Sequence, residues 1–140
     1  MLLDRTGHAL DIGDFDLFIS AFHLPYRHDT WDGTVELTDP DEVRVVFDQV
    51  RAYLKHSGAT QVVRCIIAAE FKSPDKILST HEAHMFAGTT RIRPPYPVMS
   101  ELQLRDGARK ICSSTYAVGN DAAHQAALLP KKLKRNLSSV

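Results

Sequence analysis

Three side chains able to carry acid–base chemistry stand in two stretches of alternating residues: Arg64 in the first, and Glu82 and His84 in the second. Pairing these stretches as antiparallel strands around the turn at 73–75 places Arg64 opposite His84, with Glu82 on the same face. An isolated charge removed from water costs on the order of several kcal/mol, so the three groups are predicted to satisfy one another.

This trio points to general acid–base catalysis. A glutamate beside an imidazole can hold it as a general base, and an arginine binds a carboxylate or an enolate oxygen. His84, Glu82 and Arg64 are therefore the candidate catalytic residues. The alternative is a Glu82–Arg64 salt bridge that faces solvent or a dimer interface, with His84 packed beside it. The sequence leaves both interpretations open.

Two helices are predicted in the amino-terminal part of the chain. Asp4 caps a first helix that Gly13 ends, and Asp14 caps a second one. Four large apolar side chains recur at helical spacing between Phe15 and Phe22, and this helix is expected to continue until Leu24 and the following proline. An extended stretch follows at 26–37.

The longest predicted helix spans 41–57, with a cap at Asp39 and a proline at its first helical position. From residue 60 the pattern changes to β-branched and alternating residues, which is typical of strands. Four consecutive antiparallel strands are predicted at 61–72, 76–87, 97–105 and 109–118. Helices followed by such a meander define the α+β fold class.

Composition restricts the class of protein and of partner. The chain has 140 residues, 44% of them hydrophobic, with seventeen basic and seventeen acidic residues. Four of the basic residues lie between Lys131 and Arg135, so residues 1–130 are acidic overall and nucleic-acid binding is not expected. No apolar run is long enough for a membrane span and no secretory signal is evident, which predicts a cytoplasmic protein without membrane contact.

The order of these elements carries a family resemblance. Its features are the paired first helices interrupted at 13–16, the helix at 41–57, and a meander that closes at 102–111 with the sequence LQLRDGARKI. Together they resemble the nuclear transport factor 2-like, or SnoaL-like, superfamily. The resemblance implies a cystatin-like α+β domain at 1–119, in which a curved antiparallel sheet wraps around the amino-terminal helices and encloses a pocket. Residues 120–140 are expected to form a tail with a short helix and a basic end.

The resemblance also assigns candidate pocket residues. It places His84 in the pocket lining, which would turn the even-numbered residues of that strand inward, and it adds residues from the last two strands. His81 is then expected on the opposite face. The superfamily further implies a homodimer through the sheet. The pocket residues predicted in this way are Thr80, Phe86, Ser100, Leu102, Ser114 and Tyr116.

Aromatic and imidazole groups gather between the second helix and the first strand of the family fold. Tyr26 and Trp31 belong to this cluster and could grip a flat ligand, although Trp31 also suits a core or a dimer contact. His23 and His28 lack an evident third ligand, so no metal site is predicted. No cofactor is predicted either, because neither a glycine-rich phosphate loop nor a nucleophile elbow is present.

The resemblance does not decide the reaction, because this fold hosts many functions. Thr6, Thr30 and Ser100 stand where ketosteroid isomerases carry their functional tyrosine and acids, which disfavours steroid isomerisation. The preferred function is a domain that binds a small apolar or aromatic ligand, with possible lyase, isomerase or cyclase activity on a carbonyl compound. The alternative is a non-catalytic homodimer used for ligand binding or as an accessory subunit.

Overall fold

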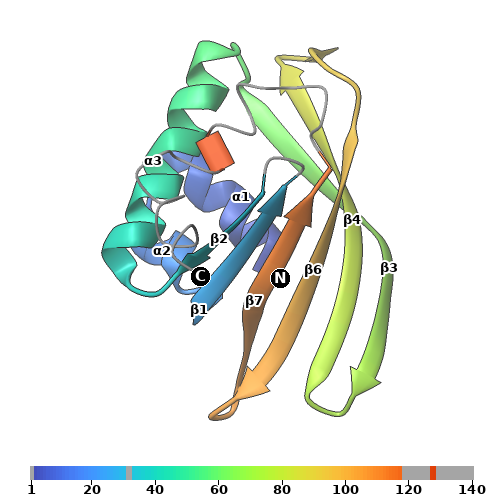
Figure 1. Ribbon diagram of the computed structural model, residues 1–140. Coiled ribbons are helices and arrows are strands. Elements are labelled where there is room, and N and C mark those ends of the chain that lie inside the picture. The colour runs from blue at the N-terminus through green and yellow to red at the C-terminus, as the bar shows by residue number, and fades with distance from the viewer. Residues whose placement is uncertain (1, 31–32, 118–126, 129–140) are drawn as a thin grey trace.

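A computed structural model describes residues 2–30, 33–117 and 127–128 of the chain, which form a helical layer against one face of a curved sheet (Figure 1). The helices are α1 (Leu2–Ile12), α2 (Phe15–Ile19) and α3 (Pro40–His56). The strands are β1 (Phe22–Thr30), β2 (Gly33–Leu37), β3 (Gln61–Ser73), β4 (Lys76–Ala87), β5 (Thr90–Arg91), β6 (Tyr96–Arg105) and β7 (Ala108–Tyr116). The α+β class predicted from the sequence is confirmed.

The helix boundaries follow from local capping. Helix α1 ends at Gly13, whose φ of 77° lies in the left-handed region and whose N–H donates to the Ala9 carbonyl at 2.9 Å. Asp14 caps α2 by accepting from the Leu17 N–H at 3.0 Å. Asp39 caps α3 by accepting from the Glu42 N–H at 3.0 Å. The predicted starts of α2 and α3 agree with these caps. Helix α1 begins at Leu2, so Asp4, the predicted cap, lies within its first turn instead.

One helix is shorter than predicted. The apolar spacing from Phe15 to Phe22 predicts a helix that continues to Leu24, but α2 ends at Ile19 and Phe22 is the first residue of β1. The cause is tertiary pairing, because the Ile111 N–H of β7 donates to the Ala21 carbonyl at 2.9 Å. Phe22 remains in the core, as the helical pattern requires.

The sheet has the strand order β2-β1-β7-β6-β4-β3, with β5 paired to β4. All neighbouring strands are antiparallel except β1 and β7, which run parallel. The predicted four-strand meander is therefore present as β3, β4, β6 and β7. Strand β1 joins the free edge of β7, and this brings the amino-terminal residues beside the carboxyl-terminal strand.

A bulge in β3 decides which side chains share a face. Near the hairpin the pairing is the predicted one, with Phe71 opposite Ile77 and Ala68 opposite Thr80. The register shifts between Ile66 and Ala68, so that Ile66 pairs with His81. Because side chains alternate along a strand, a shift of one residue moves the following side chains to the other face.

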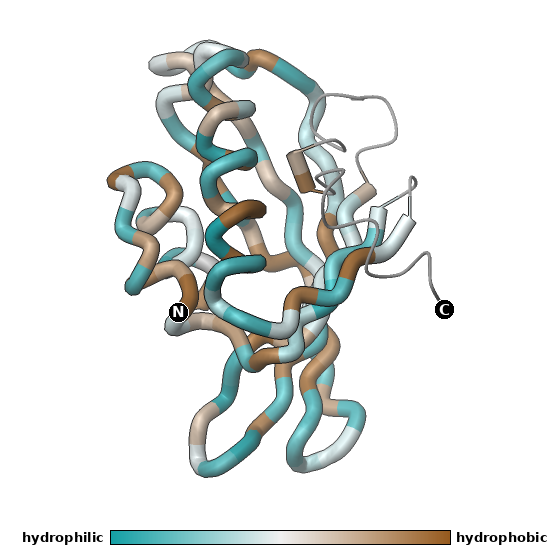
Figure 2. Tube along the Cα trace, turned by 60° about the vertical axis from the view of Figure 1, so that its left-hand side comes forward, coloured by the Kyte–Doolittle hydropathy of each residue, from teal (hydrophilic) through white to brown (hydrophobic). Residues whose placement is uncertain are grey.

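The core lies between the helices and the inner face of the sheet, which we define as the face that carries the helices. Phe47 of α3 packs at 4.9 Å from Phe18, measured between ring centroids, and Phe18 packs at 4.9 Å from Phe22. Hydrophobic and hydrophilic residues alternate along the trace, and the β3–β4 and β6–β7 hairpins extend past the helical layer (Figure 2). None of the helices in the described ranges is long and apolar enough to cross a membrane.

Candidate functional site

A cavity lies between the helices and the inner face of the sheet, and its lining comes from all three helices and from β1, β3, β4, β6 and β7. Its volume is about 50 Å³. Since one water needs roughly 10–15 Å³, the cavity has room for a compact ligand. The lining residues are Thr6, Leu10, Phe18, Phe22, His28, Val46, Val50, Leu54, Val62, Arg64, His81, Tyr96, Ser100, Ile111, Ser114, Tyr116 and Leu128.

The two walls of the cavity differ in chemistry. Helices α1, α2 and α3 contribute apolar side chains, with Thr6 as their one polar member among the lining residues of the described chain. The sheet contributes the imidazole, guanidinium and hydroxyl groups. A ligand here would place its apolar body against the helices and its polar groups against the sheet, which is typical of small-molecule sites.

His81 is the polar group most open to a new partner. It is only 4% exposed, and its Nδ1 atom is buried without a hydrogen-bond partner among the described residues. Burial lowers the pKa of His81 to about 4, and the positive charge of Arg64 lowers it further. The ring is therefore neutral at neutral pH and can accept a proton or a hydrogen bond.

A second histidine closes the cavity near the carboxyl end of the described chain. His28 is 3% exposed and its Nδ1 lies 3.4 Å from the Leu128 carbonyl oxygen. Burial lowers its pKa to about 4, although the contact with Leu128 opposes that shift. Its ring packs edge-on against Tyr26 at 4.6 Å and against Tyr116 at 5.2 Å, between centroids. His28 is thus held in place by its neighbours.

Arg64 is the one cation in the cavity lining given by the described residues. It enters from β3 and reaches α1, where a Cβ atom at Gly7 would lie 2.5 Å from its Nη1. Its charge opposes the rise in pKa that burial causes at Tyr96 and Tyr116, so the guanidinium lies near both phenols. No carboxylate lies within 4.0 Å of Arg64 in the ranges that the structure describes.

Hydroxyl groups line the floor of the cavity. The Ser100 and Ser114 hydroxyls are 3.0 Å apart, and both residues are buried, at 2% and 3% exposed. Burial raises the pKa of Tyr116, so its hydroxyl keeps its proton at neutral pH. These groups can donate hydrogen bonds to a carbonyl oxygen.

The predicted catalytic trio is not assembled. Arg64 pairs with Ala83 rather than with His84, because the bulge at Ile67 shifts the register. Arg64 therefore lies on the inner face, whereas Glu82 and His84 lie on the outer face and do not line the cavity. The prediction that these three side chains share one hollow is wrong.

The outer-face residues still contact one another. His84 Nε2 lies 3.3 Å from Glu82 Oε1, and Arg91 Nη1 lies 2.6 Å from His84 Nδ1. The predicted Glu82–His84 contact thus exists, with Arg91 in place of Arg64 as the neighbouring cation. Phe86 packs against Arg91, whose guanidinium carbon is 5.3 Å from the ring centroid.

The other predicted pocket residues divide between the two faces. Ser100, Ser114 and Tyr116 line the cavity together with Arg64, whereas Thr80 and Phe86 are on the outer face with Glu82. Leu102 packs against the main core and Tyr26 is buried in it at 2% exposed, so neither lines the cavity directly. Burial and the neighbouring Tyr116 raise the pKa of Tyr26. Trp31 lies outside the described residues.

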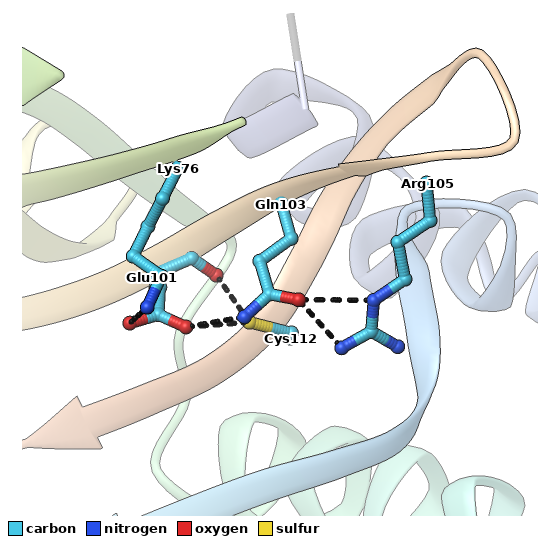
Figure 3. A network of polar contacts seen from close by, with 5 residues as sticks. All are labelled: Lys76, Glu101, Gln103, Arg105 and Cys112. Carbon is cyan, nitrogen blue, oxygen red and sulfur yellow. Dashed lines mark hydrogen bonds and ion pairs between the residues drawn. The ribbon is translucent and has the colours of Figure 1, made fainter. Parts of the chain in front are cut away.

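The outer face carries a row of satisfied polar groups (Figure 3). Glu101 accepts from Gln103 Nε2 at 2.7 Å and from Cys112 Sγ at 3.2 Å, and it lies 3.8 Å from Lys76 Nζ. Arg105 donates to Gln103 Oε1 at 2.7 and 2.9 Å. Burial and the Glu101 carboxylate raise the pKa of the Cys112 thiol to about 12, so this thiol is unreactive at neutral pH.

Sequence reasoning missed His81, although the signal was present. Along β4 the odd-numbered residues include Ile77, Ala83 and Met85, and the even-numbered ones include Glu82. The more apolar set belongs on the face that packs against the helices. That rule places His81 on the inner face, as the structure does. The described residues contain no group of three or more potential metal ligands.

Known structures share the architecture over most of the chain. A cystatin-like domain of unknown function from Nostoc punctiforme PCC 73102 is 13% identical with a TM-score of 0.67, covering 99% of this chain and 88% of that one. An NTF2-like protein with a cystatin-like fold from Novosphingobium aromaticivorans is 15% identical with a TM-score of 0.63, covering 91% and 84%.

A third similar structure is an enzyme by its name. The hexachlorocyclohexane dehydrochlorinase LinA-type3 from Novosphingobium barchaimii LL02 is 16% identical with a TM-score of 0.60, covering 82% of this chain and 80% of that one. The sequence matches no protein-family model and no curated protein. At these identities the similarity establishes the architecture and not the activity. The chain therefore has the NTF2-like, cystatin-like fold that its sequence resembles.

Proposed function

We propose that the chain is a small-molecule-binding SnoaL-like domain that acts on an apolar carbonyl compound in the inner cavity by general acid–base chemistry. The observation that supports this proposal is His81, which lines the cavity and whose buried Nδ1 has no partner among the described residues. A buried polar atom left unpaired costs about 1–3 kcal/mol. A ligand that supplies the missing partner recovers this free energy.

The cavity suits removal of a proton from a carbon next to a carbonyl group. The proton moves from that carbon to His81, and the electron pair moves onto the carbonyl oxygen. Ser100, Ser114 and Tyr116 are the hydroxyl donors available to this oxygen. Return of the proton to another atom completes an isomerisation, and departure of a leaving group completes an elimination.

The low pKa of His81 in the free protein, about 4, makes it a weak base. Negative charge that develops beside the ring favours the imidazolium and raises this pKa during the reaction. The LinA-type3 neighbour is named a dehydrochlorinase, so this fold accommodates an elimination in that protein. Lyase or isomerase chemistry is consistent with a histidine base at this position and with the elimination named for the similar protein.

Solvent exchange tests the proposal. The protein is incubated in D₂O with acetone and with pyruvate, two ketones of compact size, and the loss of the C–H signals next to the ketone carbonyl group is followed by proton NMR. We expect catalysed exchange that His81→Gln abolishes and that His84→Gln, the matched outer-face variant, retains. Exchange that is equally fast in His81→Gln, or absent with every ketone tried, would contradict the acid–base role.

A specific observation also supports the alternative, a non-catalytic homodimer that binds a ligand or serves as an accessory subunit. Strand β3 is an edge strand whose residues from Cys65 to Ser73 are exposed, including Ile66 at 45%, Ile67 at 58% and Phe71 at 66%. An apolar exposed edge favours a protein contact. Analytical ultracentrifugation of the wild type and of Ile67→Lys measures dimer formation. We expect the wild type to form a dimer and the lysine variant to dimerise more weakly. A wild type that stays monomeric would contradict the homodimer.

A further inference from the structure

The charges that line the cavity are unbalanced. Among the cavity residues of the described chain there is one permanent cation, Arg64, and no aspartate or glutamate. The two histidines of the lining, His28 and His81, have pKa values of about 4 because they are buried, so they are neutral at neutral pH. The lining therefore carries a net charge of plus one.

The acidic groups near Arg64 lie outside the cavity. Arg64 also lines an open surface pocket together with Gly7, Asp4 and Asp11, and Asp11 interacts with it electrostatically, but neither carboxylate lies within 4.0 Å of Arg64. A half-buried guanidinium without a paired carboxylate is costly, because its hydration is only partly replaced. An anionic ligand would remove this cost.

Gly7 creates the space that the guanidinium occupies. It lies inside α1, where glycine destabilises a helix by about 1 kcal/mol relative to alanine. Its backbone needs no special conformation, since its φ is not in the left-handed region. A Cβ at this position would lie 2.5 Å from Arg64 Nη1, the far end of a flexible side chain, so an alanine here would force the guanidinium to move.

We propose that the ligand of this cavity is a small carboxylic acid in its anionic form, held through its carboxylate by Arg64, which Gly7 positions. The inference rests on the proposed function in one respect, that the cavity binds a small ligand. The planar fork of the guanidinium matches a carboxylate in two parallel hydrogen bonds. The apolar helical wall receives the remainder of the molecule.

Carboxylate chemistry fits this site better than phosphate chemistry. A phosphate group is commonly a dianion and takes several donors or cations, whereas the described lining offers one guanidinium and a mostly apolar wall. The volume of about 50 Å³ also favours a compact anion. Ser100 and Ser114 remain available for a second polar group of the ligand, such as a ketone.

A matched ligand pair tests the inference. Propionate and its neutral isostere propionamide, both compact enough for this cavity, are titrated into the full chain, and binding is measured by calorimetry and by the shift in Tm. We expect the wild type to bind the carboxylate at least about tenfold more tightly, since a hydrogen-bonded charge pair contributes about 1.5–3 kcal/mol. Arg64→Met should abolish the preference and Arg91→Met, on the outer face, should keep it.

The variants remain informative even without a ligand. Arg64→Met removes an unpaired charge, so the free protein is expected to be as stable as the wild type or more stable. Gly7→Ala favours the helix but displaces the guanidinium, so it should lower carboxylate affinity without lowering Tm, while affinity for the carboxamide stays unchanged.

Three results would overturn the inference, and they differ in meaning. Equal affinity of the wild type for carboxylate and carboxamide would refute the anionic ligand and leave the proposed function standing. Failure of both compounds and of the ketones to bind would contradict the proposed function as well. A carboxylate preference that survives in Arg64→Met would show that another group binds the anion.

Discussion

The two faces of β4 carry histidines that are three residues apart and have opposite surroundings. His81 is on the inner face, buried beside apolar walls, with its Nδ1 unpartnered among the described residues. His84 is on the outer face, where both ring nitrogens have partners in Glu82 and Arg91. The comparison shows that the face of the sheet on which a histidine lies determines whether its ring nitrogens already have partners or can still bind a ligand.

The same contrast extends across the sheet. On the outer face Glu101, Gln103 and Arg105 form a row in which each side chain has a partner in its neighbour. On the inner face Arg64 has no paired carboxylate among the described residues. Of the three buried side-chain atoms that have no partner among the described residues, His81 Nδ1 belongs to a residue that lines the cavity, whereas those of Tyr26 and Arg109 do not. A ligand in the cavity would supply a partner to His81.

The largest expected effect separates the two histidines by activity. His81→Gln should slow catalysed exchange by a factor of about 10²–10⁴, the usual contribution of a general base, whereas His84→Gln should stay within about twofold of the wild type. Exchange rates from proton NMR in D₂O provide the measurement. Loss of exchange in His84→Gln with retention of exchange in His81→Gln would show that the general base is His84 on the outer face and not His81.

Two methionines give a matched test of packing. Met85 is fully buried on the inner face of β4, and Met99 of β6 is 49% exposed on the outer face. Met85→Ala should destabilise the fold by about 2–5 kcal/mol, because it leaves a cavity in the core, and Met99→Ala by less than about 0.5 kcal/mol. Urea unfolding measures both. Equal effects would contradict the inner and outer assignment.

The pH dependence of stability provides the next comparison. His28 and His81 have pKa values of about 4 in the folded protein, below the ordinary value of 6.5. The unfolded chain then binds more protons between these values, so the free energy of unfolding should fall as the pH drops from 6.5 to 4. For the fully buried His28 this loss is at most about 3 kcal/mol.

Single substitutions of the histidines test whether the loss of stability at low pH comes from the inner-face residues. The decrease should be smaller in His81→Gln and in His28→Gln than in the wild type, as measured by urea unfolding at several pH values. Stability of the wild type that does not change between pH 6.5 and 4 would show that neither inner histidine is held neutral by the fold.

The smallest effect is expected for the outer ion pair. Glu82 is paired with His84 at 3.3 Å near the surface, and exposed pairs of this kind contribute about 0–1 kcal/mol. Glu82→Gln should therefore change Tm only slightly and leave ligand affinity unchanged. A large loss of ligand affinity in this variant would show that Glu82 takes part in ligand binding.

Much of the fold was predictable because local signals are strong in this chain. The caps at Asp14 and Asp39 and the glycine stop at Gly13 set helix boundaries through contacts within a few residues. The site was not predictable in the same way. Which residues line the cavity depends on the bulge at Ile67, and no local sequence motif predicts that bulge. It depends also on the pairing of β1 with β7, which are far apart in the sequence.

The error in the predicted site follows from this physical difference. Ser100, Ser114 and Tyr116 line the cavity, as expected, because the part of β6 and β7 that pairs Val98 with Tyr116 and Ser100 with Ser114 keeps the regular alternation. The register shift between these two strands comes after Glu101. The side chains of β4 were assigned to the wrong faces because the family comparison outweighed the hydropathy of its odd-numbered residues. Arg64 lines the cavity because the register of β3 is shifted by one residue. The strand pairing predicted from the sequence did not include this shift.

Chemical-shift mapping tests the central claim most directly, that the inner face and not the outer face binds the ligand. Propionate is titrated into isotope-labelled protein, and the signals of Arg64, His81 and Ser100 are compared with those of Glu82 and His84. We predict saturable shifts for the first group and small shifts for the second. Saturable shifts confined to Glu82 and His84 would contradict the account.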